Sequence, residues 1–297
     1  MAARGLALIL VVIGLTGCIS NAPATRTAYT GPTDPMAKVV EDVNANNSRV
    51  PTLWAKGYYE ANIVDHGKKY FVNGDVNLLY RQPSDLRLVA KKDVAGAVFE
   101  IGSNAEQYWL IVKADVDTMW HGRHGGEQAN ESQRMPIQPE LMLEVLGVAT
   151  IDTNFKQPPV PVMRFNDYAD AYMFVWNAPA PDRWVATKEV WYDRASKLPV
   201  KVILFDANGR VVVGANLSKH KPAGADDASA APKVATRYDL TFPDSGSSMT
   251  FELNELLPRR GNVPNDKSFL FPSEPGVNRI IDVDAPEPAA PRHAPER

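Results

Sequence analysis

The 297-residue chain has a single cysteine, Cys18, which excludes a fold that depends on intramolecular disulfides. The folded region must therefore be stabilised by its hydrophobic core. Basic residues do not gather in a patch interleaved with aromatics, and the formal net charge is −3, so nucleic acid is not an expected partner. After the first eighteen residues, no apolar run approaches the roughly 20 residues that a transmembrane helix needs.

Sequence signatures of catalysis are also missing. The chain has no G-x-S-x-G nucleophile motif, no phosphate-binding glycine loop and no dinucleotide fingerprint. Carboxylates are plentiful, but no motif pairs two of them for acid–base chemistry. We therefore expect neither an enzyme nor a bound cofactor.

The five histidines provide one candidate metal site, at His121 and His124 with Glu127 close by. This H-x-x-H pair lies in a glycine-rich segment and lacks the i, i+4 spacing of a zinc-binding helix. Two exposed loop histidines are the favoured interpretation, so no metal site is expected. His66 is expected in a turn, and His220, between two lysines, in a solvated loop.

The beginning of the chain has the layout of an export signal. Arg4 precedes a short apolar run over residues 5–15, which leads into the tetrapeptide 15–18, LTGC. This tetrapeptide resembles the lipobox of bacterial lipoproteins. The resemblance implies a signal peptide over residues 1–17 and attachment of acyl chains such as palmitate to Cys18. A chance cysteine in an ordinary signal peptide and an uncleaved anchor are the two alternatives.

Ile19 follows the cysteine, at the position where enteric-type bacteria place aspartate in lipoproteins kept at the inner membrane. By this resemblance we expect a cell-envelope protein anchored to the outer membrane and facing the periplasm. Residues 18–35 are small, polar and rich in proline, which predicts a flexible lipidated tether. Residues 284–297 are rich in proline and alanine and predict a disordered tail. The folded domain is expected over residues 36–283.

Much of the chain alternates between apolar and polar residues, as β-strands do. In the segment 68–80, Tyr70, Val72 and Leu78 share one parity, and the other parity is mostly polar. Similar segments, separated by polar turns, run from residue 53 to residue 121 and predict an antiparallel meander. Trp109 and Ile111 are apolar on the second parity of their segment, so we expect both faces of that strand to be covered, with helices as the cover.

Two segments have helical spacing of apolar residues, 36–49 and 139–148, and Asp34 is the expected cap of the first. Residues 206–209, DANG, predict a hairpin turn. Residues 153–170 contain three prolines and are interpreted as a long connection. The pattern as a whole predicts a mainly β, α+β fold with about 10–11 strands and two or three helices.

Four stretches, 58–69, 74–92, 97–113 and 116–124, together resemble the LolA/LolB-type lipoprotein carrier superfamily. The resemblance rests on this layout of strands and turns rather than on a catalytic signature. It implies an open, strongly curved antiparallel β half-barrel with helices covering its concave side. The chain differs from the soluble carrier of that superfamily in its lipobox-like segment and in its greater length.

In such a half-barrel, the apolar parity would line a hydrophobic cavity for lipid or for the acyl chains of lipoproteins, as in lipid or lipoprotein trafficking at the outer membrane. The residues expected there are Tyr59, Tyr70, Val72, Leu78, Leu88, Phe99 and Leu110. The alternative is a non-enzymatic scaffold lipoprotein of the cell envelope, with the half-barrel filled by its own side chains and its surface binding an envelope protein partner. The same residue pattern fits both hypotheses.

Overall fold

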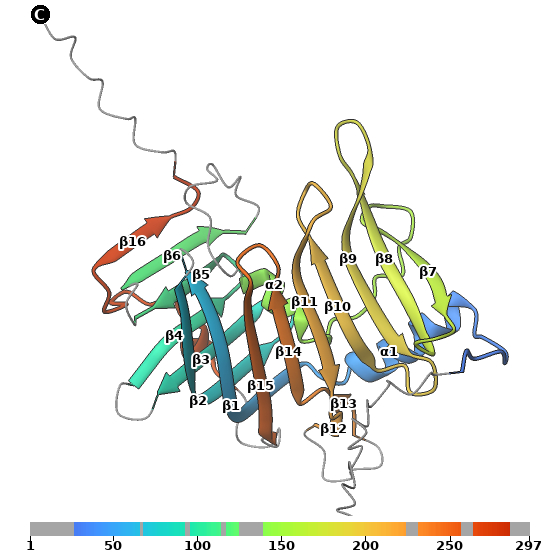
Figure 1. Cartoon of the computed structure of the whole chain (residues 1–297), viewed down its shortest axis with the longest axis horizontal. Coiled ribbons are helices and arrows are strands. Elements are labelled where there is room, and N and C mark those ends of the chain that lie inside the picture. Colours follow the sequence, from blue (N-terminus) through green and yellow to red (C-terminus); the bar gives the residue numbers. More distant parts are fainter. Residues whose placement is uncertain are drawn as a thin grey trace, which may run out of the picture.

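The computed structural model describes residues 27–65, 68–92, 96–113, 117–124, 139–223, 231–256 and 264–285. These residues form one large, curved and unclosed β-sheet, a small second sheet and a few short helices (Figure 1). The mainly β, open half-barrel predicted from the sequence is therefore confirmed. The predicted strand number is too low, because the described residues contain sixteen strands, fourteen of them in the large sheet.

The element boundaries follow the chain in order. The strands before the second helix are β1 (Thr52–Asp65), β2 (Lys68–Arg81), β3 (Asp85–Lys92), β4 (Gly96–Ser103), β5 (Gln107–Val112) and β6 (Thr118–Arg123). Those after it are β7 (Val160–Asn166), β8 (Ala171–Pro179), β9 (Trp184–Asp193), β10 (Pro199–Phe205), β11 (Val211–Ser218), β12 (Lys221–Pro222), β13 (Lys233–Val234), β14 (Arg237–Phe242), β15 (Ser247–Leu256) and β16 (Arg279–Asp282). The helices are α1 (Met36–Asn47), α2 (Pro139–Val145) and the 3₁₀ helix η3 (Asp266–Phe269).

The large sheet consists of two antiparallel meanders that meet where β1 pairs with β15, and of the edge strand β16. Its strand order is β16-β6-β5-β4-β3-β2-β1-β15-β14-β11-β10-β9-β8-β7, and β12 pairs with β13 in the small sheet. The strands β6 and β7 are consecutive in the chain but lie near opposite ends of this sheet. The connection between them must cross the molecule, and α2 forms within it.

The strand β7 corrects the prediction that residues 153–170 form only a connection. Among the described strands it is the outermost at one end of the sheet, where it pairs with β8 alone. A proline lacks the backbone N–H that a central strand needs for pairing on both sides. An edge strand tolerates a proline, and Pro161 lies in such a strand here. The other strands missing from the prediction are β16, which pairs in parallel with β6, and the two-residue strands β12 and β13.

The two predicted helices are confirmed, and both end earlier than predicted. The helix α1 buries Val39, Val40 and Val43, and α2 contributes Met142 and Val145 to the same core cluster. Asp34 does not cap α1, which starts after Pro35 without a side-chain cap. No helix in the described ranges is long and apolar enough to cross a membrane.

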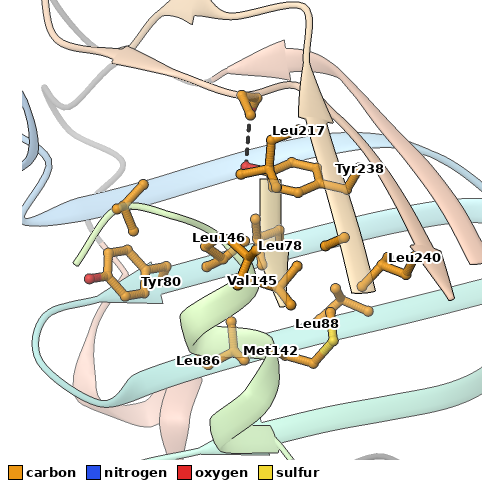
Figure 2. Close-up of a cluster of buried hydrophobic side chains, with 14 of the residues drawn as sticks. Leu78, Tyr80, Leu86, Leu88, Met142, Val145, Leu146, Leu217, Tyr238 and Leu240 are labelled. Carbon is orange, nitrogen blue, oxygen red and sulfur yellow. Dashed lines mark hydrogen bonds between the residues drawn. The ribbon is translucent and has the colours of Figure 1, made fainter. Parts of the chain in front are cut away.

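A main part of the core lies where the sheet packs against α2. Figure 2 shows Leu78, Leu86 and Leu88 of β2 and β3 on one side of this helix. Leu217, Tyr238 and Leu240 of β11 and β14 face them, and every residue labelled in the figure is at most 3% exposed. Burial of this apolar area, at roughly 25 cal/mol per Å², stabilises the curvature that brings the two meanders together.

Residues 264–285, here called the C-terminal strap, run along the convex face of the first meander and end in the edge strand β16. The ring of Phe271 contacts the ring of Trp109 edge-on, with 5.6 Å between centroids, and it contacts His121 at 5.4 Å. Trp109 and Ile111 are buried as a result. The prediction that both faces of β5 are covered is confirmed, but the residues that cover the convex face, Phe271 and Val277, lie in the strap outside any helix.

Candidate functional site

The residues predicted to line a hydrophobic cavity lie on neighbouring strands of the first meander. Tyr59, Leu78, Leu88, Phe99 and Leu110 come from β1, β2, β3, β4 and β5 respectively, and each is at most 7% exposed. All five belong to one core cluster on the concave face. They are therefore assembled as the sequence parity predicts, and the protein's own side chains pack against them.

The other two predicted residues are less enclosed. Val72 is half-buried at the edge of the core cluster, whereas the side chain of Tyr70 is 37% exposed. Tyr70 pairs with Ile63 close to the β1–β2 turn, near the end of the strand. Parity places it on the concave face, but burial decreases toward the strand end.

One buried polar atom interrupts the apolar concave face. The hydroxyl oxygen of Tyr59 is buried and has no hydrogen-bond partner among the described residues. Its ring packs edge-on against Phe99, with 5.6 Å between centroids. Burial raises the pKa of Tyr59, so the group stays a neutral hydroxyl with a free donor. A ligand oxygen at this point would satisfy that donor.

Three asparagines attach the C-terminal end of α1 to the segments beside it. The side chain of Asn44 donates to the carbonyl oxygen of Ile151 and accepts from its backbone N–H. Asn46 forms the same type of pair with Lys233. Asn47 donates to the carbonyl oxygens of Gly147 and Ala149, at 3.2 and 2.7 Å. The last contact joins α1 to the turn that ends α2.

Replacing Asn47 with alanine is expected to lower the free energy of unfolding by about 1–3 kcal/mol, because carbonyl oxygens beside a buried site lose their donor. Asn47 is only 2% exposed, so water does not replace the amide without rearrangement. Urea unfolding followed by circular dichroism measures the change. Glu41→Ala is the matched control on the same helix, since Glu41 makes only a surface ion pair with Lys38 and its loss is expected to cost under about 0.5 kcal/mol. Equal unfolding midpoints for the two variants would contradict this role of Asn47.

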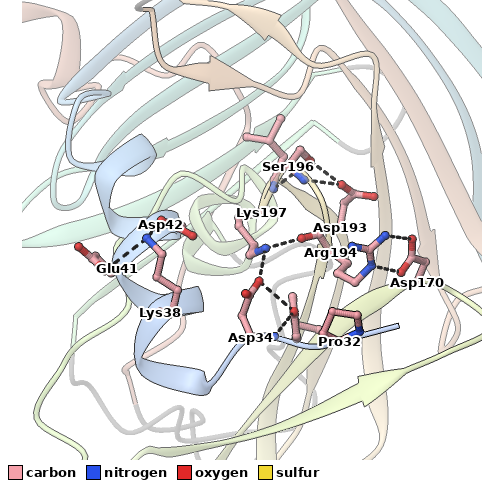
Figure 3. Close-up of polar contacts among 12 residues, drawn as sticks. Pro32, Asp34, Lys38, Glu41, Asp42, Asp170, Asp193, Arg194, Ser196 and Lys197 are labelled. Carbon is pink, nitrogen blue, oxygen red and sulfur yellow. Dashed lines mark hydrogen bonds and ion pairs between the residues drawn. The ribbon is translucent and has the colours of Figure 1, made fainter. Parts of the chain in front are cut away.

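The N-terminal end of α1 is fixed by a second polar cluster (Figure 3). Asp34 forms an ion pair with Lys197 at 2.7 Å, and its backbone N–H donates to the hydroxyl of Tyr172 at 2.7 Å. The hydrogen bond from Lys197 is the main reason that the pKa of Asp34 is lowered. Nearby, Arg194 pairs with Asp170. These contacts attach the start of α1 to β8 and to the turn after β9.

The last residues of the predicted tether lie on this same part of the sheet. The backbone N–H of Tyr29 donates to the carbonyl oxygen of Asp167, and the guanidinium of Arg194 lies 3.8 Å from the centre of the Tyr29 ring. The tether therefore approaches the domain beside the β7–β8 turn. Cys18 lies outside the described residues.

One ion pair is described between the helix α2 and the strands of the concave face. Glu144 of α2 and Lys188 of β9 form an ion pair of 2.7 Å. The ammonium of Lys188 also lies 4.6 Å from the centre of the Trp176 ring. Sequence reasoning missed both residues, since only strand pairing reveals that Lys188 faces the helix.

The two histidines of the candidate metal site, His121 and His124, make different contacts. His121 packs on Phe271, whereas a ring nitrogen of His124 lies 2.8 Å from the carbonyl oxygen of Asn104 and 3.2 Å from the hydroxyl of Ser103. Within the described ranges no three His, Cys, Asp or Glu side chains are grouped as metal ligands. His66 and Glu127 lie outside those ranges.

The expectation that His220 is solvated is wrong. Its Nε2 lies 2.9 Å from the carbonyl oxygen of Pro199, and the side chain is half-buried. Burial, with a smaller effect of Lys233, lowers the pKa of His220 below 6.5, while the Pro199 carbonyl and Asp193 oppose this. His220 lies directly before β12, which pairs with β13, and its ring lies against the Pro199 carbonyl rather than free in solvent.

His220 is expected to make stability depend on pH just below neutrality. Because its pKa is lowered in the folded state, the unfolded chain binds the proton first, and stability falls as the pH drops below about 6.5. His220→Gln keeps a donor for the Pro199 carbonyl and removes the titration. Urea midpoints at pH 7.0 and pH 5.5 should therefore differ less for the variant than for the wild type. An unchanged pH dependence would contradict the assignment.

A hollow at the surface lies beside the exposed side of α1. It is lined mostly by polar side chains of that helix and of the segment 150–153: Glu41, Asn44, Ala45, Ser48, Thr150, Ile151, Asp152 and Thr153. Such a lining does not suit acyl chains. The apolar concave face beneath α1 and α2 is therefore the better candidate for a ligand site.

Among the comparisons with known proteins, only the comparison with solved structures found similar proteins. No family model matches the chain, and no curated protein sequence matches it. A DUF1329 family protein from Desulfovibrio piger is similar at TM-score 0.49 and 13% identity, over 80% of this chain and all of that one. A putative outer membrane lipoprotein-sorting protein domain from Vibrio parahaemolyticus is similar at TM-score 0.48 and 14% identity, over 78% of this chain and 94% of that one. A LolA superfamily protein from Nitrosomonas europaea is similar at TM-score 0.48 and 13% identity, over 81% of this chain and 99% of that one. Structures similar to this chain thus include one of the superfamily that its sequence resembles.

Proposed function

We propose that the protein is a membrane-anchored binding protein of the bacterial cell envelope, which holds lipid or the acyl chains of lipoproteins against the concave face of its half-barrel. In this proposal Cys18 carries the lipid anchor, the domain faces the periplasm from the outer membrane, and the role is in lipid or lipoprotein trafficking. The protein acts without catalysis and without a cofactor. Residues 36–283 form the binding domain.

The observation that carries the proposal is an apolar concave wall covered by the two helices α1 and α2. The seven-residue helix α2 and the turn that follows it fill the space over Leu78, Leu86 and Leu88 with Met142, Val145 and Leu146. An acyl chain offers the same kind of surface, and each buried CH₂ contributes about 0.8 kcal/mol. Exchange of helix side chains for acyl chains is therefore close to neutral in free energy, which a carrier that loads and unloads requires.

The unpartnered hydroxyl of Tyr59 supports ligand binding over a self-filled core. Tyr59→Phe removes a donor that has no described partner, so it is expected to leave the free energy of unfolding unchanged or to raise it by up to about 1 kcal/mol. Tyr238→Phe is the matched control, because the Tyr238 hydroxyl donates to the carbonyl oxygen of Ala235 at 2.9 Å, and its loss should cost about 1 kcal/mol.

The same Tyr59→Phe variant should bind a fatty acid several-fold more weakly than the wild type if a ligand oxygen reaches that hydroxyl. Tyr238→Phe should bind it with unchanged affinity. Calorimetric or fluorescence titration at equal protein concentration gives both values. A Tyr59→Phe variant that is clearly destabilised and binds normally would contradict this assignment.

A scaffold function is the second candidate, and complete burial of the five central cavity residues favours it. In that case the half-barrel would serve only as a stable core, and the exposed surface would bind an envelope protein partner. Exposed aromatic side chains such as Phe71 and Trp184, at 59% and 61%, are available on that surface.

Titration with a fluorescent fatty acid separates the two candidates. A soluble form that begins at Ser20 is mixed with the probe, and the increase in fluorescence is followed to saturation. The carrier proposal predicts saturable binding near one equivalent that an unlabelled fatty acid reverses. Absence of saturable binding, while the protein is folded by circular dichroism, would favour the scaffold.

A further inference from the structure

Lys188 is a cation on the concave wall of the half-barrel. It pairs in register with Leu204 of β10 and Trp176 of β8, and both of these belong to the buried core on that face. Its side chain is only 21% exposed, and its Nζ lies 4.6 Å from the centre of the Trp176 ring. A positive charge is thus held by a cation–π contact at the edge of an apolar surface, and the limited access of water there strengthens its attraction to anions.

The counter-ion of this lysine lies on a helix that covers the site. Glu144 of α2 approaches Nζ to 2.7 Å, and its own side chain is 38% exposed. If α2 moves away from the wall, Glu144 moves with it, while Trp176 and Lys188 remain on the sheet. A partly buried charge that loses its partner is unfavourable, so the opened site favours a ligand that brings a negative group to the same place.

We propose that Lys188 binds the anionic group of an amphiphile, a carboxylate or a phosphate, whose acyl chains lie on the concave face. The anion takes the position of the Glu144 carboxylate and forms a charge-assisted hydrogen bond with Nζ. This inference rests on the proposed function and deepens it, because it names the ligand class as anionic lipids rather than uncharged ones. It also gives Glu144 a role as the group that the ligand displaces.

The test compares two probes with the same acyl chain, one with a charged head group and one with an uncharged head group. A fluorescent fatty acid and its methyl ester are each titrated into the soluble form that begins at Ser20. The readout is the ratio of the affinity for the acid to the affinity for the ester. Lys188→Gln is expected to lower this ratio about tenfold, and Glu144→Gln is expected to raise it, because the lysine loses its competing carboxylate.

Lys201→Gln is the matched control. Lys201 lies 4.8 Å from the centre of the Trp191 ring and is one position removed from Val202, so this second lysine–tryptophan pair lies on the opposite, convex face of the same strands. Its substitution should leave the ratio unchanged. Acetate should displace neither probe, because an anion without an acyl chain has no apolar surface to bury.

The outcomes separate this inference from the function on which it rests. If Lys188 serves only to hold α2, then Lys188→Gln and Glu144→Gln change both affinities by the same factor, and the unchanged ratio overturns the inference while lipid binding stands. Displacement of the acid by acetate also overturns the assignment to an amphiphile. If the wild type binds neither probe, the proposed function itself fails.

Discussion

Replacing Gly57 with alanine is expected to destabilise the protein by about 3 kcal/mol or more. Gly57 lies in β1 at a register shift, where β1 pairs with Leu253 of β15 and the two meanders join. A Cβ at this position would lie 1.9 Å from the backbone carbonyl oxygen of Glu252. A backbone atom in the middle of a sheet cannot rotate aside, so the joint between the meanders must open.

Gly214→Ala provides the control for this prediction. Gly214 also lies in a strand of the sheet, but a Cβ there would meet only the hydroxyl of Thr241, at 3.0 Å, and that side chain can rotate. Its cost is expected to stay under about 1 kcal/mol, mostly from local adjustment. Urea unfolding of both variants measures the difference. Equal midpoints for Gly57→Ala and Gly214→Ala would show that the joint does not hold the two meanders together.

Replacing Cys18 with serine is expected to abolish acylation and move the protein out of the lipid-anchored membrane fraction. Several acyl chains, at about 0.8 kcal/mol per buried CH₂, make the anchored state effectively permanent, and a hydroxyl cannot replace the thiol in forming it. Cell fractionation followed by intact-protein mass spectrometry gives the result. The wild type should be membrane-bound and heavier than its sequence from Cys18 onward by the mass of its lipid.

A second variant separates acylation from retention of the leader. Residues 1–17 are replaced by an ordinary cleavable signal peptide, and Cys18 is changed to serine, so the exported protein should be recovered in the soluble periplasmic fraction. A membrane-bound Cys18→Ser protein that still carries residues 1–17 would be held by its leader. Recovery of the wild type in the soluble fraction at its unmodified mass would contradict lipidation.

Local sequence patterns predicted the first meander well, because period-2 alternation is a local property. The predicted run from residue 53 to residue 121 corresponds to β1–β6, and the predicted DANG turn joins β10 to β11 through Asp206 and Gly209. At Gly209 the φ angle is +77°, which the glycine adopts without strain. These features depend on residues that are neighbours in the chain, so the sequence alone suffices for them.

The missed features depend on contacts between distant parts of the chain. The prolines before and within β7 argue against a strand until the topology places that strand at an edge. The apolar residues Trp109 and Ile111 indicate a cover on the second face of β5, but only the fold identifies residues 264–285 as that cover. His220 looks solvated in a low-complexity segment, but its ring is half-buried and contacts Pro199, which is distant in the sequence.

In the candidate site too, local patterns were predicted and contacts between distant parts of the chain were missed. Parity identified the apolar wall from Tyr59 to Leu110, since it needs only the alternation within each strand. Asn47 and Lys188 remained hidden, because their importance comes from the helix or strand that each one faces. Tyr70 has the right parity and lies near the end of its strand, where the core no longer covers it fully. Burial along a strand depends on which parts of the chain pack over it, and parity does not encode this.

Lipid that co-purifies with the protein tests the central proposal most directly. The soluble form beginning at Ser20 is purified from a bacterial host without detergent, extracted with organic solvent and analysed by mass spectrometry beside an unrelated periplasmic β protein. If the concave face holds lipid, acyl lipid should be present in near-stoichiometric amount and absent from the unrelated protein. A folded protein that carries no lipid in this measurement and takes up no added fatty acid would contradict the proposal, and the half-barrel would then be a scaffold filled by its own side chains.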